Sequence, residues 1–296
     1  MSNALQDSGV EDMSKVIMQN IQYDESGNSE EKNTFKFTNK VVQSNALARA
    51  ASGMNLIPLK IFKAAISCID ANTPPDKMGD NTVYIEKADI IKLAGSKASH
   101  NYTYFKEQLF LLKQQSVLIY DSQEKGSRIL SPIRQVFWSE ESPVIGIQFE
   151  ELLMPQLIGL SKRFTQYNIS NLIGVKSKYT INLYESLLSR AREFGIKVIT
   201  IPIDELRLEL GSTVVNPITK KKKVLYAAYP DFEKRAVKTA VNEINTMISF
   251  EFFIIEYAPN KKGRTYQSIT FKLRKRTSIT DTIDHIAFPE RLKGKI

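Results

Sequence analysis

The sequence of 296 residues predicts an α+β protein in which one arrangement of helices and strands occurs twice. First, apolar spacing and turn residues indicate the same order of elements in both halves: helix, strand, helix, helix, strand, turn, strand. Second, the segments 89–95 and 205–211 share one spacing of acidic residue, apolar residues and terminal glycine. This order is that of a winged helix, a helix-turn-helix variant that carries a β-hairpin. We therefore predict tandem duplicated winged-helix domains.

The elements of the first half follow from apolar periodicity and from turn signals between the periodic segments. Gly95 can end the second helix in a left-handed conformation, and Ser99 or Asn101 can cap the third. Pro132 interrupts the last strand. The predicted elements are a helix over 56–69, a strand over 83–85, a short helix around 90–93, a helix over 102–115, and a hairpin of 117–120 with 129–138.

The second half repeats this order from Lys178 onward. Asp204 can cap its second helix, which Gly211 ends, and Pro230 suits the first turn of its third helix. The predicted elements are a helix from 178, a strand over 198–201, a helix over 204–210, a helix over 230–247, and a hairpin of 250–257 with 264–273 around a turn at 258–263.

The chain is long enough for two domains, each with its own core. Residues 1–35 are polar and aperiodic, which is typical of a disordered tail. We expect an N-terminal winged-helix domain over 36–150 and a C-terminal one over 177–275, followed by a tail over 276–296. Between them, 151–176 is predicted to be a connecting helical segment, with a helix over 152–167 that breaks near Pro155.

Composition argues against several functional classes. One cysteine, Cys68, and two histidines, His100 and His285, leave no disulfide framework and no ligand set for a structural zinc ion. No phosphate-binding G-x-x-x-x-G-K-[ST] segment occurs. We therefore expect no enzyme activity, no cofactor and no metal. Without a signal-peptide pattern or a membrane-spanning apolar run, the chain is expected to be cytoplasmic and free of membrane.

Basic charge is concentrated in the second half. The net charge of the chain is +9, and residues 151–296 carry 25 basic and 14 acidic side chains, whereas residues 51–150 carry 11 of each. A one-sided excess of this kind is typical of a domain that binds a polyanion. A basic surface that only improves solubility is the alternative.

The third helix of the second half has the residues needed to contact DNA. Its apolar residues recur on one face, and its polar residues lie on the other at spacings of three and four. Arg, Lys and Asn can bond base edges, while cations and hydroxyl groups bind phosphates. Any surface helix also has polar residues outside, so the pattern alone leaves that alternative open. The candidates are Lys234, Arg235, Lys238, Thr239, Asn242 and Asn245.

Further candidate DNA contacts lie in loops and in the first half. Four consecutive lysines at 220–223 precede the third helix and suit flexible phosphate binding, with Lys221 and Lys222 as candidates. Lys261, Lys262 and Arg264 stand beside the glycine of the second hairpin turn. The equivalent helix of the first half supplies fewer such residues: Lys97, Ser99, Asn101 and Lys106.

Several segments of the second half resemble plasmid replication initiators of the iteron-binding Rep family. They are Ser177–Glu185, Ile203–Leu206 with Gly211, Phe232–Arg235 leading to Asn242–Asn245, and Lys262–Arg264 with Ile269–Phe271. The resemblance implies a protein that binds directly repeated double-stranded origin DNA (iterons) and helps to open the origin. It also implies recruitment of a host initiator and the replicative helicase or its loader, and repression of its own gene as a dimer.

A dedicated winged-helix transcriptional repressor without a role in initiation is the alternative function. A plasmid-borne gene beside tandem repeats of about 20 base pairs would favour the initiator over the repressor. Within either function, the neutral first domain and its proline-interrupted strand over 129–138 suggest a sheet edge that mediates self-association. The second domain is then expected to carry most of the specific DNA affinity.

Overall fold

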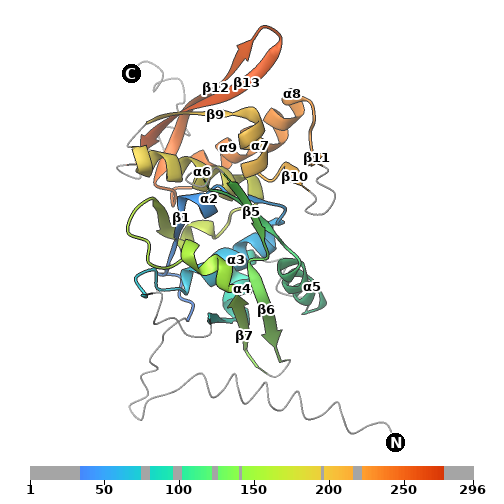
Figure 1. Cartoon of the computed structure of the whole chain (residues 1–296), viewed down its shortest axis with the longest axis vertical. Helices are drawn as coiled ribbons and strands as arrows, with labels where there is room; N and C mark the ends of the chain where they lie inside the picture. Colours follow the sequence, from blue (N-terminus) through green and yellow to red (C-terminus); the bar gives the residue numbers. More distant parts are fainter. Residues whose placement is uncertain are drawn as a thin grey trace, which may run out of the picture.

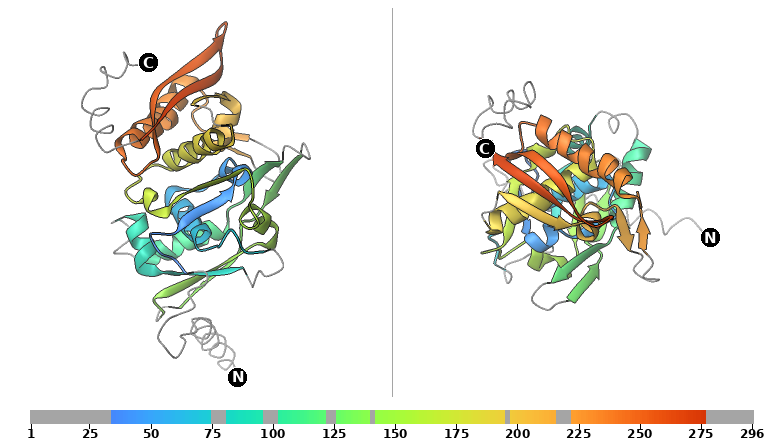
Figure 2. Two further views of the ribbon diagram at one scale, coloured as in Figure 1. Left: turned by 90° about the vertical axis from the view of Figure 1, so that its left-hand side faces the viewer. Right: turned by 90° about the horizontal axis from the view of Figure 1, so that it is seen from above.

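The computed structural model describes residues 34–74, 81–95, 102–121, 126–139, 142–194, 197–215 and 222–276. The two halves of the chain stack along its long axis, and the β12–β13 hairpin projects from the far end of the second half (Figure 1). The winged-helix order of elements occurs in both halves, as predicted. Two further views show helix α6, Lys178–Phe194, between the two halves (Figure 2).

The three helices predicted for the first half are confirmed close to their predicted bounds. Gly95 follows the helix Lys87–Ala94 and has a φ of 92°, a positive value that glycine adopts without strain. Its elements are α2 Asn45–Ala48, α3 Leu56–Ser67, β3 Thr82–Glu86, α4 Lys87–Ala94, α5 Tyr102–Lys113, β4 Val117–Asp121 and β5 Gly126–Leu130.

The predicted hairpin strand over 129–138 is wrong. β5 pairs with β4 and ends at Leu130, whereas Ile133–Trp138 forms a separate strand, β6, which pairs with β7, Val144–Phe149. Pro132 lies between them, and a residue without an N–H group cannot continue a ladder of hydrogen bonds. The resulting sheets have the orders β2-β4-β5, with β2 at Ala51–Ser52, and β3-β7-β6. The first half thus keeps the winged-helix order but changes the strand pairing.

The predicted helix over 152–167 is also wrong. Residues Glu151–Gln156 form a 3-10 helix around Pro155, and Phe164–Asn168 form strand β8. β8 pairs antiparallel with β1, Lys40–Ser44, and a second 3-10 helix follows at Ile169–Leu172. Because the partner strand lies more than one hundred residues earlier, local periodicity gave no signal for this pairing.

The second half contains a complete winged-helix sheet, with strand order β12-β13-β9. Its hairpin is longer than predicted, since residues 258–262 continue β12 rather than form the turn. A small hairpin, β10–β11, was not predicted, and α7 begins at Ile203, so Asp204 lies in its first turn rather than at its cap. The further elements are β9 Val198–Pro202, α7 Ile203–Glu209, β10 Thr213–Val215, β11 Lys222–Val224, α8 Tyr229–Phe232, η5 Glu233–Val237, α9 Lys238–Thr246, β12 Phe252–Lys262 and β13 Thr265–Lys275.

Helix α3 lies at the centre of the first half, and its residues from Pro58 to Ser67 are all buried. The burial includes Lys60, whose Nζ donates a hydrogen bond to the carbonyl of Leu93 at 2.8 Å. Desolvation by this burial lowers the pKa of Lys60 to about 8. Buried apolar residues of both halves form one continuous core.

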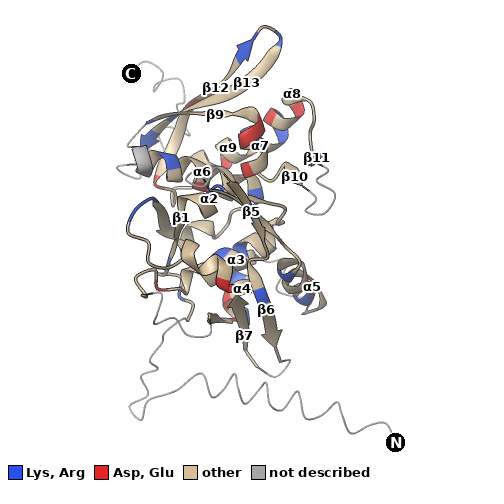
Figure 3. Cartoon of the chain, viewed as in Figure 1, with Lys and Arg blue, Asp and Glu red and all other residues tan. Residues whose placement is uncertain are grey.

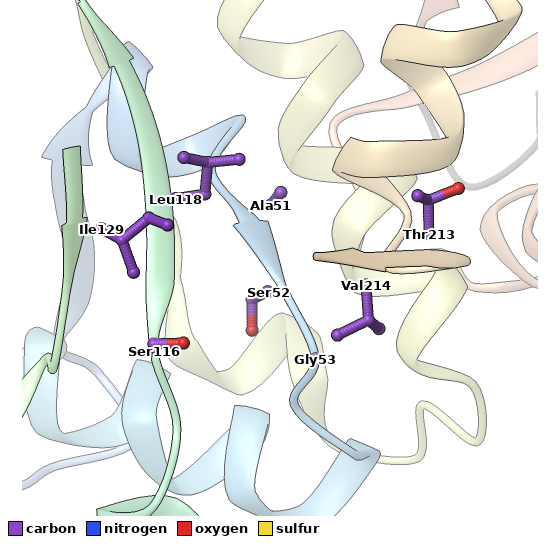
Figure 4. A pocket seen from close by; sticks show the side chains of 8 residues that line it. All are labelled: Ala51, Ser52, Gly53, Ser116, Leu118, Ile129, Thr213 and Val214. Atoms are coloured by element: carbon purple, nitrogen blue, oxygen red, sulfur yellow. The ribbon is translucent and has the colours of Figure 1, made fainter. Parts of the chain in front are cut away.

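Close backbone packing joins the halves at Gly211, which ends the turn after α7. Its φ is 65°, and a Cβ atom there would lie 2.4 Å from the carbonyl oxygen of Ser52 in β2. Beside it, Val214 of β10 and Gly53 line a pocket of about 40 Å³ between β10 and the β2–β4–β5 sheet (Figure 4). Only glycine therefore allows this approach of α7 to β2.

The substitution Gly211→Ala is expected to destabilise the protein more than Gly263→Ala. Both glycines have nearly the same positive φ, 65° and 62°, but nothing lies within 4 Å of a Cβ atom at Gly263. Gly263→Ala should cost only the backbone strain, about 1–2 kcal/mol. Gly211→Ala should cost about 1–3 kcal/mol more because the methyl group clashes with Ser52. Urea unfolding of both variants measures the difference, and equal losses would show that the contact with Ser52 is not tight.

Candidate nucleic-acid interface

A continuous helix over 229–246, here called the recognition helix, lies on the outer side of the second half. It consists of α8, a π-helical turn (η5) and α9. Pro230 occupies its first turn, as predicted. The apolar residues predicted for its inner face are all buried: Phe232, Ala236, Val237, Ala240, Val241 and Ile244. This burial fixes which side of the helix faces solvent.

Five of the six predicted contact residues on this helix are exposed. Lys234, Arg235, Lys238, Thr239 and Asn242 all lie on its solvent side. Arg235 is paired only loosely, with 4.0 Å between its Nε and a carboxylate oxygen of Asp231, and both side chains are more than half exposed. Exposed ion pairs of this kind contribute little, so the guanidinium group can exchange this partner for a phosphate or a base.

Asn245, the sixth candidate, is engaged inside the domain. Its Nδ2 donates a hydrogen bond to the carbonyl of Ile254 at 2.9 Å, and its Oδ1 accepts one from the N–H of Ile254 at 2.7 Å. This bidentate pairing ties the recognition helix to strand β12. We therefore remove Asn245 from the set of expected base contacts, because its amide already has partners in the backbone.

Arg276 secures the same end of the helix. Its Nη2 donates to the carbonyls of Ile244 and Asn245 at 2.9 and 3.1 Å. A cation at a helix C-terminus satisfies carbonyls that have no partner within the helix and opposes the negative end of its dipole. The guanidinium also packs on the ring of Phe253, 5.4 Å from its centroid. The end of β13 therefore holds the C-terminus of the recognition helix.

The start of the recognition helix is positioned by Arg207 of α7. Its guanidinium donates to the carbonyls of Tyr226 and Ala227 at 2.8 and 3.1 Å, and stacks on the ring of Phe232 at 4.3 Å. α7 is itself bound to α6 through Arg190, which pairs with Glu205 at 2.6 Å and with Glu209 at 2.7 Å. Sequence reasoning missed both arginines, because their partners are backbone carbonyls or residues on other helices.

Glu243 links the recognition helix to the N-terminus of α6. Its carboxylate accepts hydrogen bonds from the backbone N–H groups of Lys176 and Ser177, at 2.7 and 3.2 Å, and from the hydroxyl of Thr180 at 2.5 Å. A carboxylate at this position satisfies N–H groups that lack partners within the helix and complements the helix dipole. Sequence reasoning also missed this role of Glu243.

The β12–β13 hairpin forms a basic wing beside the recognition helix. Lys261, Lys262 and Arg264 are exposed at its tip, where Gly263 makes the turn with a φ of 62° (Figure 3). The Nζ of Lys261 lies 4.4 Å from the centroid of Tyr266, a cation–π contact. The tip therefore places three cations together at the projecting end of the molecule.

Tyrosines fill the space between the wing and the start of the recognition helix. The rings of Tyr229 and Tyr266 stack with centroids 3.8 Å apart, and the hydroxyl of Tyr257 donates to the carboxylate of Glu233. Burial and the charge of Glu233 raise the pKa of Tyr229 to about 12, and that of Tyr257 is also raised. An open hollow of about 380 Å³ remains beside them. These contacts set the angle of the wing against the helix.

The remaining predicted contacts are less well placed by the structure. Lys97, Ser99, Asn101 and Lys221 lie outside the described residues. Lys222 lies in β11, whose backbone pairs with β10, where it is opposite Val215. Lys106 lies on α5 and is half-buried. The same helix exposes Glu107, Lys113 and Phe110, the last 62% exposed, so its outer side carries fewer exposed cations than the recognition helix.

Two negative findings apply to the described residues alone. They contain no cluster of three or more His, Cys, Asp or Glu side chains that could hold a metal ion. None of the helices within the described ranges is both long and apolar enough to cross a membrane.

Asn245→Ala and Asn242→Ala form a matched pair on the recognition helix. Asn245→Ala removes two hydrogen bonds and leaves the backbone of Ile254 without its partner, so we expect a loss of about 1–3 kcal/mol of unfolding free energy. Asn242→Ala changes an exposed side chain and is expected to stay within about 0.5 kcal/mol of the parent protein. Chemical denaturation of both variants tests the assignment, and the reverse order of losses would contradict it.

Comparison with known proteins agrees with this architecture. The family described as "Initiator Replication protein, WH1" matches residues 40–188, and the one described as "Initiator Rep protein, WH2" matches residues 202–273. An uncharacterized 27.6 kDa protein of Escherichia coli is 26% identical over 171 residues, which cover 54% of this chain and 70% of that protein.

A solved structure of the Pi initiator protein in complex with iteron DNA superposes with a TM-score of 0.66 and 19% identity. The superposition covers 82% of this chain and 100% of that one, and it supports the tandem winged-helix fold. The resemblance that the sequence suggested is thus confirmed by two family matches in the expected order. The chain belongs to the family of Rep initiator proteins built from two winged-helix domains.

Proposed function

We propose that this protein initiates plasmid replication by binding directly repeated double-stranded DNA at the plasmid origin. The observation that carries the proposal is the recognition helix, whose apolar side is buried while five residues suited to DNA contact face solvent beside a basic wing. Membership of the initiator family and the iteron DNA bound by the structurally similar Pi protein support the same reading.

In the proposed complex the recognition helix enters the major groove. Arg235 or Lys238 would bond guanine and Asn242 adenine, since these pairs match in donor and acceptor geometry. Thr239 would contact a thymine methyl group. The cations of the wing, Lys261, Lys262 and Arg264, would bind phosphates or the adjacent minor groove, and Lys221 and Lys222 would bind phosphates. The second domain then supplies most of the specific affinity.

The first domain is proposed to contact the next major groove through weaker backbone contacts, with Lys97, Ser99, Asn101 and Lys106 as candidates. Successive grooves lie about 34–36 Å apart, so one protomer would cover about 20 base pairs. We further propose that the protein acts without catalysis, by bending DNA and recruiting a host initiator and the replicative helicase or its loader. As a dimer it would repress its own gene. It would work in the cytoplasm, on the plasmid or with the nucleoid.

Lys238→Ala and Asn242→Ala are each expected to lower affinity for the origin repeat by about 1–3 kcal/mol and to relax preference at one base pair. Lys221→Ala should weaken binding to all sequences alike and reduce the salt dependence by about one unit. Anisotropy titrations on a repeat and a scrambled duplex at several salt concentrations separate the two effects. Unchanged repeat affinity in a folded Arg235/Lys238/Asn242 triple alanine variant would refute the assignment.

Self-association is proposed to use strand edges of the first domain. Within the described residues β5 is bonded only to β4, and β9 of the second domain only to β13. Ile129 on β5 and Val198 on β9 are 39% and 48% exposed. Because a charge on an edge strand blocks edge-to-edge pairing, Ile129→Lys should lower the dimer fraction at least about tenfold, whereas Val198→Lys should not. Sedimentation velocity measures both, and the opposite result would place the interface on the second domain.

A further inference from the structure

A buried ion pair joins the two halves of the chain. The Nζ of Lys63, on α3, lies 2.8 Å from a carboxylate oxygen of Glu185, on α6, and the side chains are only 4% and 2% exposed. α3 is the first helix of the N-terminal winged helix, and α6 is the first helix of the C-terminal one. The pair therefore spans the junction between the two DNA-facing units.

The first half surrounds this carboxylate with further partners. Gln43 of β1 donates from Nε2 to Glu185 Oε1 at 2.8 Å, and its own Oε1 accepts from Lys63 Nζ at 2.9 Å. The hydroxyl of Tyr167, on β8, donates to Glu185 Oε1 at 2.6 Å. Burial, with the charge of Glu185, raises the pKa of Tyr167 well above its usual value, so the phenol remains a donor. Lys63, Gln43 and Tyr167 thus all lie on elements that precede α6 in the chain.

A network of this kind is sensitive to orientation. Charges removed from water are compensated only when each donor and acceptor has its partner in good geometry. A rotation of α6 against α3 would leave a buried carboxylate or ammonium group without partners, so one relative orientation of the halves is strongly favoured. Two further contacts restrict the same junction: Asn45 Nδ2 donates to Ser189 O at 3.2 Å, and Gly211 packs on Ser52.

The junction is connected to the recognition helix through α6. Glu185 lies on this helix, and the N-terminus of the helix is held by Glu243 of α9. The path from Lys63 to α9 is therefore short: it runs along α6 from the buried contact at Glu185, in the middle of the helix, to the contacts of Glu243 at its N-terminus. A tilt at Glu185 would move the recognition helix relative to α5 of the first domain.

We propose that the Lys63–Glu185 joint sets the spacing between the two DNA contact patches that the protein accepts. This proposal rests on the proposed function, in which both winged helices contact one duplex. One added base pair moves the second patch by about 3.4 Å along the duplex and rotates it by about 35°. A rigid joint cannot absorb such a change, whereas a loosened one can. Lys63 and Glu185 are then positioning residues that lie away from the DNA.

The test uses the full chain and a duplex that carries one repeat from the origin of the plasmid that encodes the protein. Two altered duplexes carry one base pair more or one base pair fewer between the two protected patches. The parent protein should protect two patches and lose at least about tenfold in affinity on the altered duplexes. Lys63→Met/Glu185→Leu replaces the buried pair with apolar side chains of similar size, which commonly preserves folding. The double variant should lose less than about threefold in affinity on the altered duplexes.

A matched control is the exposed pair within the first domain, Arg134 and Glu151, whose N–O distance is 3.6 Å. Arg134→Met/Glu151→Leu should keep the parental spacing penalty. The ratio of affinities between spacings separates positioning from a general loss of stability, which would lower all affinities together. Should the double variant not fold, Lys63→Gln/Glu185→Gln removes both charges together and keeps polar side chains of similar size that can still form hydrogen bonds, and it is expected to show a reduced penalty.

The outcomes distinguish the joint from the function on which it rests. If folded Lys63→Met/Glu185→Leu, or folded Lys63→Gln/Glu185→Gln, protects two patches and keeps the parental penalty, the joint is overturned and the proposed function stays intact. Failure of the parent protein to bind the repeat, or protection of a single patch, overturns both.

Discussion

A carboxylate buried in a protein interior needs hydrogen-bond donors, and this chain supplies them to Glu185 from segments that precede α6. Lys63, Gln43 and Tyr167 converge on that one side chain from α3, β1 and β8. These elements can meet only after β8 has paired with β1 and α6 has packed against both. The arrangement of the two winged helices therefore depends on a polar contact inside an otherwise apolar core, in which each charge is acceptable only because the other is present.

The second winged helix is supported by the same physical requirement at other places. Backbone groups at and just outside helix ends lack partners within the helix, and three side chains bind such groups here. Glu243 binds the N–H groups of Lys176 and Ser177 just before α6, and Arg276 binds the C-terminal carbonyls of α9. Arg207 binds the carbonyls of Tyr226 and Ala227 just before α8. Each of these residues is charged, yet each acts inside the domain. The net basic charge of the second half therefore overstates the number of cations that can reach DNA.

The two halves share an order of elements but differ in strand pairing and in the residues that they expose. In the second, β9 joins the wing hairpin in one sheet, so the wing is rigidly attached beside the recognition helix. In the first, β3 joins β7 and β6 instead, and the hairpin pairs with β2 near the domain junction. The outer side of α5 exposes Phe110 together with Glu107 and Lys113. A common fold thus presents three exposed cations on the third helix of one half and fewer on that of the other.

Apolar periodicity in the sequence determined the helices of the two winged-helix units, the inner face of the recognition helix and the duplicated order, because these depend on residues three or four positions apart. The helix it predicted over 152–167 was wrong. The one-sided charge marked the half with the basic wing. Strand pairing between distant segments, such as β1 with β8, was decided only by the tertiary structure, since period-two patterns do not identify a partner. The tertiary structure also decided the different roles of similar residues. Asn242 faces solvent, while Asn245, less than one turn further, binds the backbone of Ile254. The sequence shows which groups can form hydrogen bonds. The packing of distant segments decides which of those groups are bonded inside the protein and which are left to contact another molecule.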